Sequence, residues 1–243
     1  MKKILLAVLA AMNLFAGFTS YASIEKETVQ VWGTPISPFV RKVVAVLEHK
    51  HIPYHNEPVL PVALLKAQGM DVPQAFQDAS PLGKIPAITY KEFSLADSSV
   101  IVAFLEKNWC KHPVYPKKAK AYAQALWFEK YADTTMTEVL HPLFVEQFVK
   151  PKLLKVEPDQ EKIKEALAKA PTILNYLESS LVKSKGKYLV GDDLTIADIA
   201  VIQHFIDLKF AEVSFDMKDY PLLEKYLEKV MKDPCIKASL KNT

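Results

Sequence analysis

The feature that most constrains the fold is a strand, a helix and a second strand in close succession over residues 28–60. The run TVQVWG (28–33) is β-branched and aromatic and ends at a glycine, which is typical of a buried strand. SPFVRKVVAVLEHK (37–50) follows with apolar residues at helical spacing, and PYHNEPVL (53–60) is predicted to form a second strand. This order predicts two parallel strands joined by a right-handed crossover.

Ser37 and Pro38 mark the start of the predicted helix. Serine is a preferred N-cap residue, and proline suits the first helical turn because its missing N–H would be unpaired there. From these residues alone, Ser37 is either a helix cap or a hydroxyl that handles a reactive atom. The unpaired N–H groups and the dipole at a helix amino end favour an anion such as a thiolate.

The chain changes character after residue 118. Before it we expect an irregular stretch with one short helical turn near PQAFQD, a strand within SPLGKIPAITY, a turn and short strand at KEF, and a helix over residues 95–109 that Asp97 or a neighbouring serine caps. After it, four segments have the 3.6-residue periodicity of helices: 119–149, 159–184, 195–211 and 220–233.

These patterns predict two domains. An α/β domain over residues 23–110 is followed by a linker at 111–118 and by an all-helical domain over 119–243. In the helical domain, Thr195 and Asp198 have the spacing of a capping box, and the helix that follows them is apolar on nearly every side. We therefore expect that helix in the centre of the domain, with His204 as a hydrogen-bonded core residue.

Residues 1–22 have the pattern of a cleaved export signal. Lys2 and Lys3 precede the apolar run ILLAVLAAMNLFAGF, and small residues precede Ser23. The run is shorter than the ~20 residues that cross a bilayer. The alternative is a buried amino-terminal helix. We expect export to a bacterial periplasm, with no membrane attachment after cleavage.

Charge and cysteine content exclude several other functions. The chain has 31 basic and 28 acidic residues, so no nucleic-acid or acidic-membrane partner is indicated. Cys110 and Cys235 are far apart and form no C-x-x-C, which favours two free cysteines over a disulfide or a dithiol redox site. The histidines of EHKHIPYH lack a carboxylate partner and a common helix face, so no metal site is expected.

Three separated motifs resemble the cytosolic-type glutathione S-transferase family: SPFVRKV (37–43), GKIPAI (83–88) and ADSSVI (96–101). The resemblance covers residues 28–233, and the capping box at Thr195 and Asp198 is also a feature of that family. It implies a thioredoxin-like α/β amino-terminal domain, an all-α carboxy-terminal domain, and glutathione as co-substrate. A homodimer is implied as well.

The resemblance implies a catalytic role for Ser37, which would stabilise the glutathione thiolate by donating a hydrogen bond to its sulfur. Ser37 would not itself attack the substrate. A serine in place of a cysteine argues against deglutathionylation and dehydroascorbate reduction, which need a protein thiolate.

The other two motifs are implied to bind the peptide. Ile85 would pair through its backbone with the cysteine of glutathione, and Pro86 would follow a cis peptide bond. Lys84 is either a contact to a peptide carboxylate or a solvated charge. Asp97 would bind the ammonium group of the γ-glutamyl end, while Ser98 and the helix amino end would bind its α-carboxylate.

The family's electrophile site lies between the domains, where Tyr122, Trp127 and Tyr131 are the aromatic candidates, Trp127 being the one expected in the core. The expected activity is conjugation or reduction of small hydrophobic electrophiles in detoxification. Because the family is normally intracellular and this chain has an export pattern, two alternatives stay open. One is a non-catalytic binding module that carries a hydrophobic ligand or contacts a protein. The other is a glutathione-dependent isomerase.

Overall fold

A four-stranded sheet forms the centre of the first half of the chain. The computed structural model describes residues 28–185 and 187–241, so the export signal expected at residues 1–22 lies outside the described residues. The strand order is β2-β1-β3-β4, and only β1 and β2 are parallel. This arrangement confirms the predicted strand–helix–strand unit. The strands are β1 (Val29–Trp32), β2 (Tyr54–Glu57), β3 (Ala87–Tyr90) and β4 (Phe93–Ala96).

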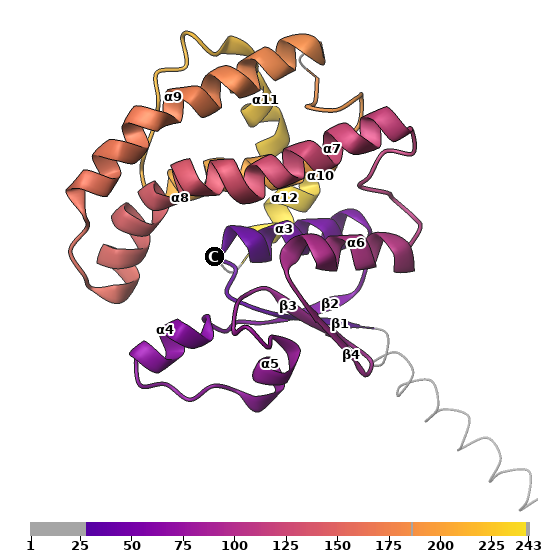
Figure 1. Ribbon diagram of the computed structural model, residues 1–243. Helices are drawn as coiled ribbons and strands as arrows, with labels where there is room; N and C mark the ends of the chain where they lie inside the picture. The colour runs from indigo at the N-terminus through magenta and orange to yellow at the C-terminus, as the bar shows by residue number, and fades with distance from the viewer. Residues whose placement is uncertain (1–27, 186, 242–243) are drawn as a thin grey trace, which may run out of the picture.

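Helices cover both faces of the sheet (Figure 1). α3 (Pro38–His49) and α6 (Ser98–Asn108) lie between the sheet and the helical half, whereas α4 (Val62–Ala67) and α5 (Gln74–Ala79) lie on the opposite face. α5 was expected as a helical turn, but α4 was not, because a helix of six residues shows little periodicity. The helix expected from residue 95 begins only at Ser98, since Leu95 and Ala96 pair with β3 as part of β4.

The second half of the chain is helical, as predicted. The run KYLVG at residues 187–191 is neither strand nor helix. The short final helix was not expected. Among residues 28–185 and 187–241, no helix has the length and apolar character needed to cross a membrane. The helices are α7 (Ala119–Tyr131), α8 (Thr137–Phe144), α9 (Gln160–Lys183), α10 (Ile196–Phe210), α11 (Pro221–Met231) and α12 (Pro234–Ser239).

The helix expected over 119–149 continues to Leu154 and contains two π-helical segments, η1 (Ala132–Met136) and η2 (Val145–Leu154). Near η1 the hydroxyl of Thr134 donates to the carbonyl of Lys130 at 2.7 Å, and the hydroxyl of Thr137 donates to that of Ala132 at 3.0 Å. These side chains satisfy carbonyls in a segment where the regular i→i−4 pattern is interrupted.

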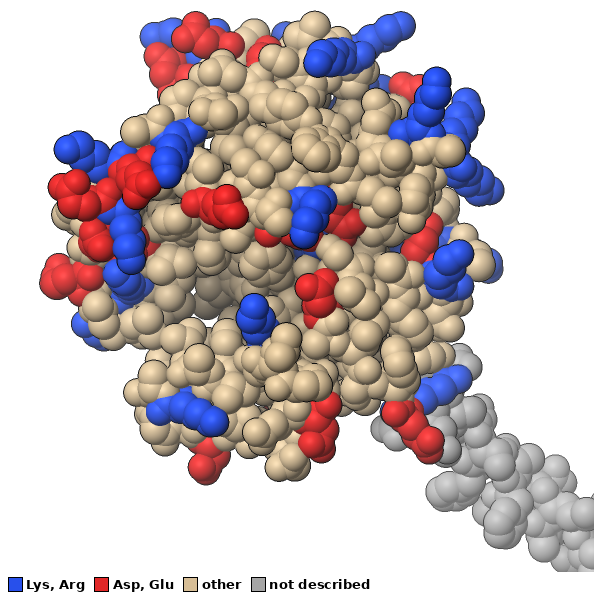
Figure 2. Space-filling view, in the orientation of Figure 1, with Lys and Arg blue, Asp and Glu red and all other residues tan. Residues whose placement is uncertain are grey.

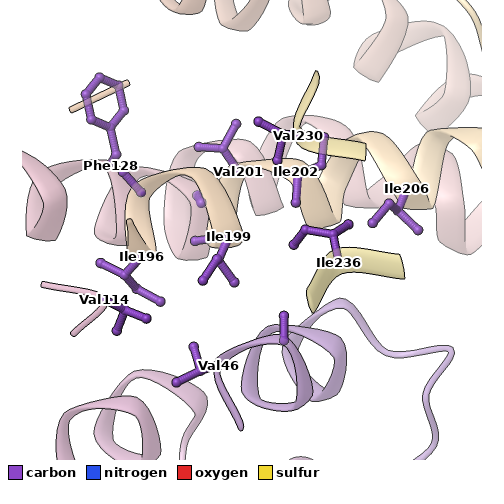
Figure 3. Close-up of a cluster of buried hydrophobic side chains, with 14 of the residues drawn as sticks. Val46, Val114, Phe128, Ile196, Ile199, Val201, Ile202, Ile206, Val230 and Ile236 are labelled. Atoms are coloured by element: carbon purple, nitrogen blue, oxygen red, sulfur yellow. The ribbon is translucent and has the colours of Figure 1, made fainter. Parts of the chain in front are cut away.

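α10 is buried along almost its whole length and packs against both halves of the molecule (Figure 3). Its isoleucines and valines meet Val46 of α3, Phe128 of α7 and Ile236 of α12 in one cluster. The predicted capping box is present, with Asp198 accepting from the Thr195 N–H at 2.9 Å. The expectation of a central helix is therefore confirmed.

Both cysteines are free, as the sequence favoured. Cys110 is exposed and Cys235 is buried. Burial, followed by the neighbouring Asp233, raises the pKa of the Cys235 thiol, so this side chain behaves as a small apolar residue rather than a nucleophile.

Candidate functional site

The register of the sheet brings the three motifs to one end of it. Trp32 at the end of β1 pairs with Ala87 at the start of β3, and Ala87 pairs with Ala96 at the end of β4. The three residues form a row across neighbouring strands, which lie about 4.8 Å apart. The chain leaves β1 and β4 and enters β3 at this row. The amino end of α3, the segment before β3 and the start of α6 therefore lie next to one another.

Ser37 occupies the N-cap position of α3. Its backbone is extended, its N–H donates to the Thr34 carbonyl, and its carbonyl accepts the N–H of Arg41, both at 3.0 Å. The side chain, however, makes no capping hydrogen bond. The hydroxyl of Ser37 is therefore free to contact a bound group beside the unpaired N–H groups of the first helical turn.

The Ile85–Pro86 peptide bond is cis, as expected. Within the described chain, no hydrogen bond uses the backbone N–H or C=O of Ile85. The neighbouring carbonyl of Lys84 is already bound by the hydroxyl of Ser80 at 2.6 Å, and the Lys84 side chain is exposed. Ile85 therefore presents an unpaired donor and acceptor at the end of the sheet, as a strand edge does.

Gly33 allows this segment to approach α3. Its φ is +144°, and a Cβ built there would lie 2.5 Å from a methyl carbon of Val40 and 3.1 Å from the Cβ of Ile85. Any larger residue at position 33 would push the amino end of α3 away from the Ile85 segment.

Asp97 and Ser98 stand where β4 gives way to α6. Asp97 has a φ of 76°, and its Oδ1 accepts from the N–H groups of Ser99 at 3.0 Å and Val100 at 3.2 Å, so it is the cap of α6. Asp97 is exposed, while Ser98 is buried. The second carboxylate oxygen of Asp97 is not used by the cap, so the residue can cap the helix and bind a cation at once.

A buried ion pair holds the start of α6 against the helical half. The Lys42 ammonium on α3 contacts Asp133 of η1 at 2.7 Å and Glu129 of α7 at 3.4 Å, and it donates to the Ser99 hydroxyl at 3.0 Å. The hydroxyl of Ser99 in turn donates to Asp133 at 2.6 Å. This pairing fixes the segment that contains Asp97 and Ser98 relative to α3 and α7.

The surface is hollowed between the helical half and the segment that carries α4, and most charged side chains on this face lie outside the hollow (Figure 2). A pocket with a volume of about 320 Å³ lies beside α4. It reaches the loop before Ser37 through Thr34 and is otherwise mainly apolar. Its walls include Val59, Leu60, Leu65 and Met70.

The three aromatic candidates fall into two groups of packed rings. Tyr122 packs on Tyr115, with ring centroids 5.5 Å apart, whereas Trp127 and Tyr131 pack together with Tyr176 of α9. The expectation that Trp127 is a core residue is wrong. Its side chain is 55% exposed and its indole N–H donates to the hydroxyl of Tyr176, because Ala125, Phe128 and Glu129 are the α7 residues turned inward.

A different aromatic group lies against the amino end of α3. The ring of His141 is 6.4 Å from that of Phe39 and 5.6 Å from that of Phe144. The run HPLFVEQF contained the signal, since aromatic rings at 141, 144 and 148 fall on one face of a helix. Five rings form one connected aromatic group that begins in the first turn of α3, two residues after Ser37: Phe39, His141, Phe144, Phe148 and Phe210.

Arg41, the one arginine of the chain, connects the Ser37 loop to α10. It is fully buried and forms an ion pair with Asp207. Burial lowers the pKa of the guanidinium, and Asp207 opposes that effect. Its other donors bind the carbonyls of Pro35 and Ile36 and both oxygens of Gln203. The loop that positions Ser37 is thus held by the helical half.

Comparisons with known proteins agree with this arrangement. The chain matches the family models "Glutathione S-transferase, N-terminal domain" over residues 36–108 and "Glutathione S-transferase, C-terminal domain" over residues 144–243. Glutathione S-transferase 1 of Dianthus caryophyllus is 25% identical over 215 residues, which cover 87% of this chain and 90% of that protein. Probable maleylacetoacetate isomerase 2 of Drosophila melanogaster is 22% identical over 82% of this chain and 81% of its own length.

The fold also matches solved structures. A glutathione S-transferase from Rhodospirillum rubrum superposes with a TM-score of 0.77 at 22% identity, covering 89% of this chain and 93% of that one. The chain therefore belongs to the glutathione S-transferase family. Its thioredoxin-like amino-terminal domain and helical carboxy-terminal domain confirm the expected fold class.

Proposed function

We propose that this protein is a glutathione transferase in which Ser37 stabilises the glutathione thiolate. The observation that supports this most is the Ser37 hydroxyl, which stands at the amino end of α3 without serving as its cap. An O–H donor and unpaired helix N–H groups at one point lower the pKa of a bound thiol, because each interaction favours the charged form. A larger fraction of the thiol is then ionised near neutral pH.

The neighbouring segments have the chemistry to bind the rest of the peptide. The unpaired N–H and C=O of Ile85, next to the cis bond to Pro86, pair with the cysteine backbone of glutathione. Asp97 binds the γ-glutamyl ammonium, and Ser98 with the α6 amino end binds its carboxylate. Lys84 is exposed and available to the glycyl carboxylate.

The acceptor is a small hydrophobic electrophile. The walls beside Ser37 are aromatic and the adjoining pocket is mainly apolar, which favours apolar acceptors. Isomerisation is a second candidate, supported by the relative named a probable maleylacetoacetate isomerase. There the thiolate would add to a double bond, allow rotation, and leave again, so that glutathione is not consumed.

The proposal includes the compartment and the oligomeric state of the enzyme. The charged start and apolar run of residues 1–22 support export to a periplasm, where the enzyme would act in detoxification. Exposed apolar side chains on β4 and α6, including Phe93 and Val100, support a homodimer. A non-catalytic binding module is the rival if glutathione does not bind.

The test is a calorimetric titration of the purified protein with glutathione, beside Ser37→Ala and a control, Ser214→Ala, that removes an exposed loop hydroxyl. We expect all three to bind glutathione with similar Kd. The pKa of the bound thiol, followed by thiolate absorbance, should be lowered in the wild type and the control but not in Ser37→Ala. Turnover should fall about 10²-fold in Ser37→Ala, as when one donor to a developing or bound anion is removed.

No binding at millimolar glutathione would overturn the enzyme and leave the binding module. Binding with an equally low thiol pKa in Ser37→Ala would leave the glutathione site standing and remove the role of Ser37. Turnover of a cis-enone substrate without loss of free thiol would favour the isomerase over the transferase.

A further inference from the structure

His141 is held in the wall of the site by a buried carboxylate. Its Nδ1 lies 3.4 Å from Oδ2 of Asp207, whose other oxygen pairs with Arg41. The Asp207 side chain is 2% exposed and the Arg41 side chain 0%, so the carboxylate is kept in one place by partners from two sides. A carboxylate in this position selects the tautomer of His141 that carries a proton on Nδ1.

The ring of His141 is also fixed by packing. It lies between Phe39, from the first turn of α3, and Phe144, one turn further along α8. Unlike Asp207, the side chain is 27% exposed. Within the described chain, no hydrogen bond uses its second nitrogen, Nε2. This nitrogen is therefore free to exchange a proton with a bound molecule.

The same contacts relate His141 to Ser37. Arg41 binds the Pro35 and Ile36 carbonyls immediately before Ser37, and it also binds the Asp207 that holds His141. Phe39, two residues after Ser37, touches the ring directly. A loop, an arginine, a carboxylate and an imidazole thus form one connected arrangement around the amino end of α3.

We propose that His141 is the proton donor of this site, and that it makes α,β-unsaturated carbonyl compounds a preferred substrate class. The proposal rests on the proposed function, because it needs a glutathione thiolate at Ser37. It adds a residue that acts on the electrophile rather than on glutathione. Asp207 positions His141, and Arg41 positions Asp207.

The proposed step balances with no other reactant than water. The thiol of bound glutathione releases its proton to water beside Ser37, and Nε2 of His141 takes up one proton from water, which gives an imidazolium paired with Asp207. The thiolate then forms a C–S bond to the β-carbon, and the electron pair of the C=C bond moves onto the carbonyl to give an enolate. The Nε2 proton moves to this enolate, which leaves a neutral imidazole and the saturated conjugate.

An aryl chloride offers the matched comparison, since chloride leaves with its bonding pair and needs no proton. The full-length protein would be assayed with glutathione and either 4-phenyl-3-buten-2-one or 1-chloro-2,4-dinitrobenzene. In His141→Gln we expect kcat/KM for the enone to fall about 10²-fold, as when a general acid is removed. The value for the aryl chloride should stay within threefold. His55→Gln, which removes an exposed histidine on β2, is the control and should leave both unchanged.

His141→Asn separates catalysis from structure, because its amide N–H can still face Asp207 while nothing replaces Nε2. Loss of the enone reaction in both variants, with an unchanged melting temperature, supports the proposal. An equal loss with both substrates would show that His141 has a structural role. No loss with either substrate would show that His141 is not the proton donor. Either result overturns the role of His141 and leaves the proposed glutathione transferase standing. A wild type that neither binds glutathione nor turns over either substrate overturns the proposed function with it.

Discussion

His204 of α10 and Arg41 of α3 are both buried, but only the arginine has partners that stabilise its charge. Arg41 stays charged because Asp207 and several carbonyls surround its guanidinium. His204 has no such set of partners, and its Nδ1 is a buried polar atom without a hydrogen bond. Burial lowers its pKa to about 4, although Asp207 nearby opposes this. The neutral form of His204 is therefore the one that fits the fold.

This predicts a specific loss of stability in acid. The unfolded chain protonates His204 near pH 6.5, but the folded protein does so only near pH 4. The contribution of neutral His204 to the free energy of unfolding is thus fully present above pH 6.5. It is lost as the pH falls through 4, at up to ~1.4 kcal/mol per pH unit. Urea unfolding of the wild type and His204→Gln between pH 7.5 and 4 should show the difference. Parallel pH dependences would contradict it.

The local structure at Ser37, Pro86 and Asp97, the residues of the candidate peptide site, was predictable because each belongs to a local pattern. Ser37 precedes Pro38, Pro86 follows Ile85, and Asp97 precedes a helix, so short-range chemistry predicts each place in the fold. The position of Trp127 was not predicted correctly. Periodicity shows that Trp127 lies on a helix, but which side of α7 turns inward depends on α9 and α10. That information is tertiary.

Among the elements, α6 begins at a residue, Asp97, that both caps the helix and is a candidate ligand-binding residue. Asp97 ends β4, takes a positive φ and caps the helix with Oδ1. Short helices were harder to predict even where a cap is present: α4 and α12 have six residues each, although Asp233 caps α12, and the π-helical segments have no simple sequence signature. The length and caps of an element decide how much of it the sequence reveals.

Two substitutions separate the roles of Asp97. Asp97→Asn keeps an oxygen that can cap α6 and tolerates the positive φ, so the free energy of unfolding should change by less than ~0.5 kcal/mol. Asp97→Ala loses the cap and strains the backbone, which should cost about 2 kcal/mol. Both should weaken glutathione binding about tenfold, because the charged partner of the ammonium is lost.

Urea unfolding and calorimetry measure the two effects. If Asp97→Asn is as unstable as Asp97→Ala, capping does not explain the position. If Asp97→Asn binds glutathione as tightly as the wild type, its carboxylate does not contact the ligand.

At the scale of the whole molecule, the two halves share one core. α3 belongs to the sheet domain, yet it packs against α10 and α12, and Val46 and Val44 lie in the same cluster as Ile199 and Ile236 (Figure 3). Arg41 and Lys42 add buried ion pairs across the same junction. One part of the exposed apolar surface lies away from that junction, at Phe93 on the edge strand β4 and Val100 on α6.

That surface predicts a dimer that a single charge disrupts. Phe93 is 46% exposed and touches Phe104, which also meets Tyr90 and Trp109. We expect sedimentation velocity to give about twice the mass of one chain for the wild type and one chain for Phe93→Asp, since a buried unpaired carboxylate opposes association. Val182→Asp, at an exposed apolar position on α9, should stay dimeric. A monomeric wild type at tens of micromolar would contradict the dimer.

The π-helical segment η1 lies within one continuous helical stretch from α7 to α8. In such a stretch, the number of residues determines the direction in which the later side chains face. Each residue of an α-helix turns the chain by about 100°. The π-helical turn of η1 holds one residue more than an α-helical turn, so removing one residue from Ala132–Met136 would let the segment become a regular α-helix while the helix after it kept its direction. The same deletion in the α-helical turn of residues 137–140 would rotate His141 away from Phe39 and Asp207, while Glu129 and Lys42 upstream kept their contact. A one-residue deletion is therefore expected to be tolerated at η1 and to move His141 when it falls in the regular turn that follows.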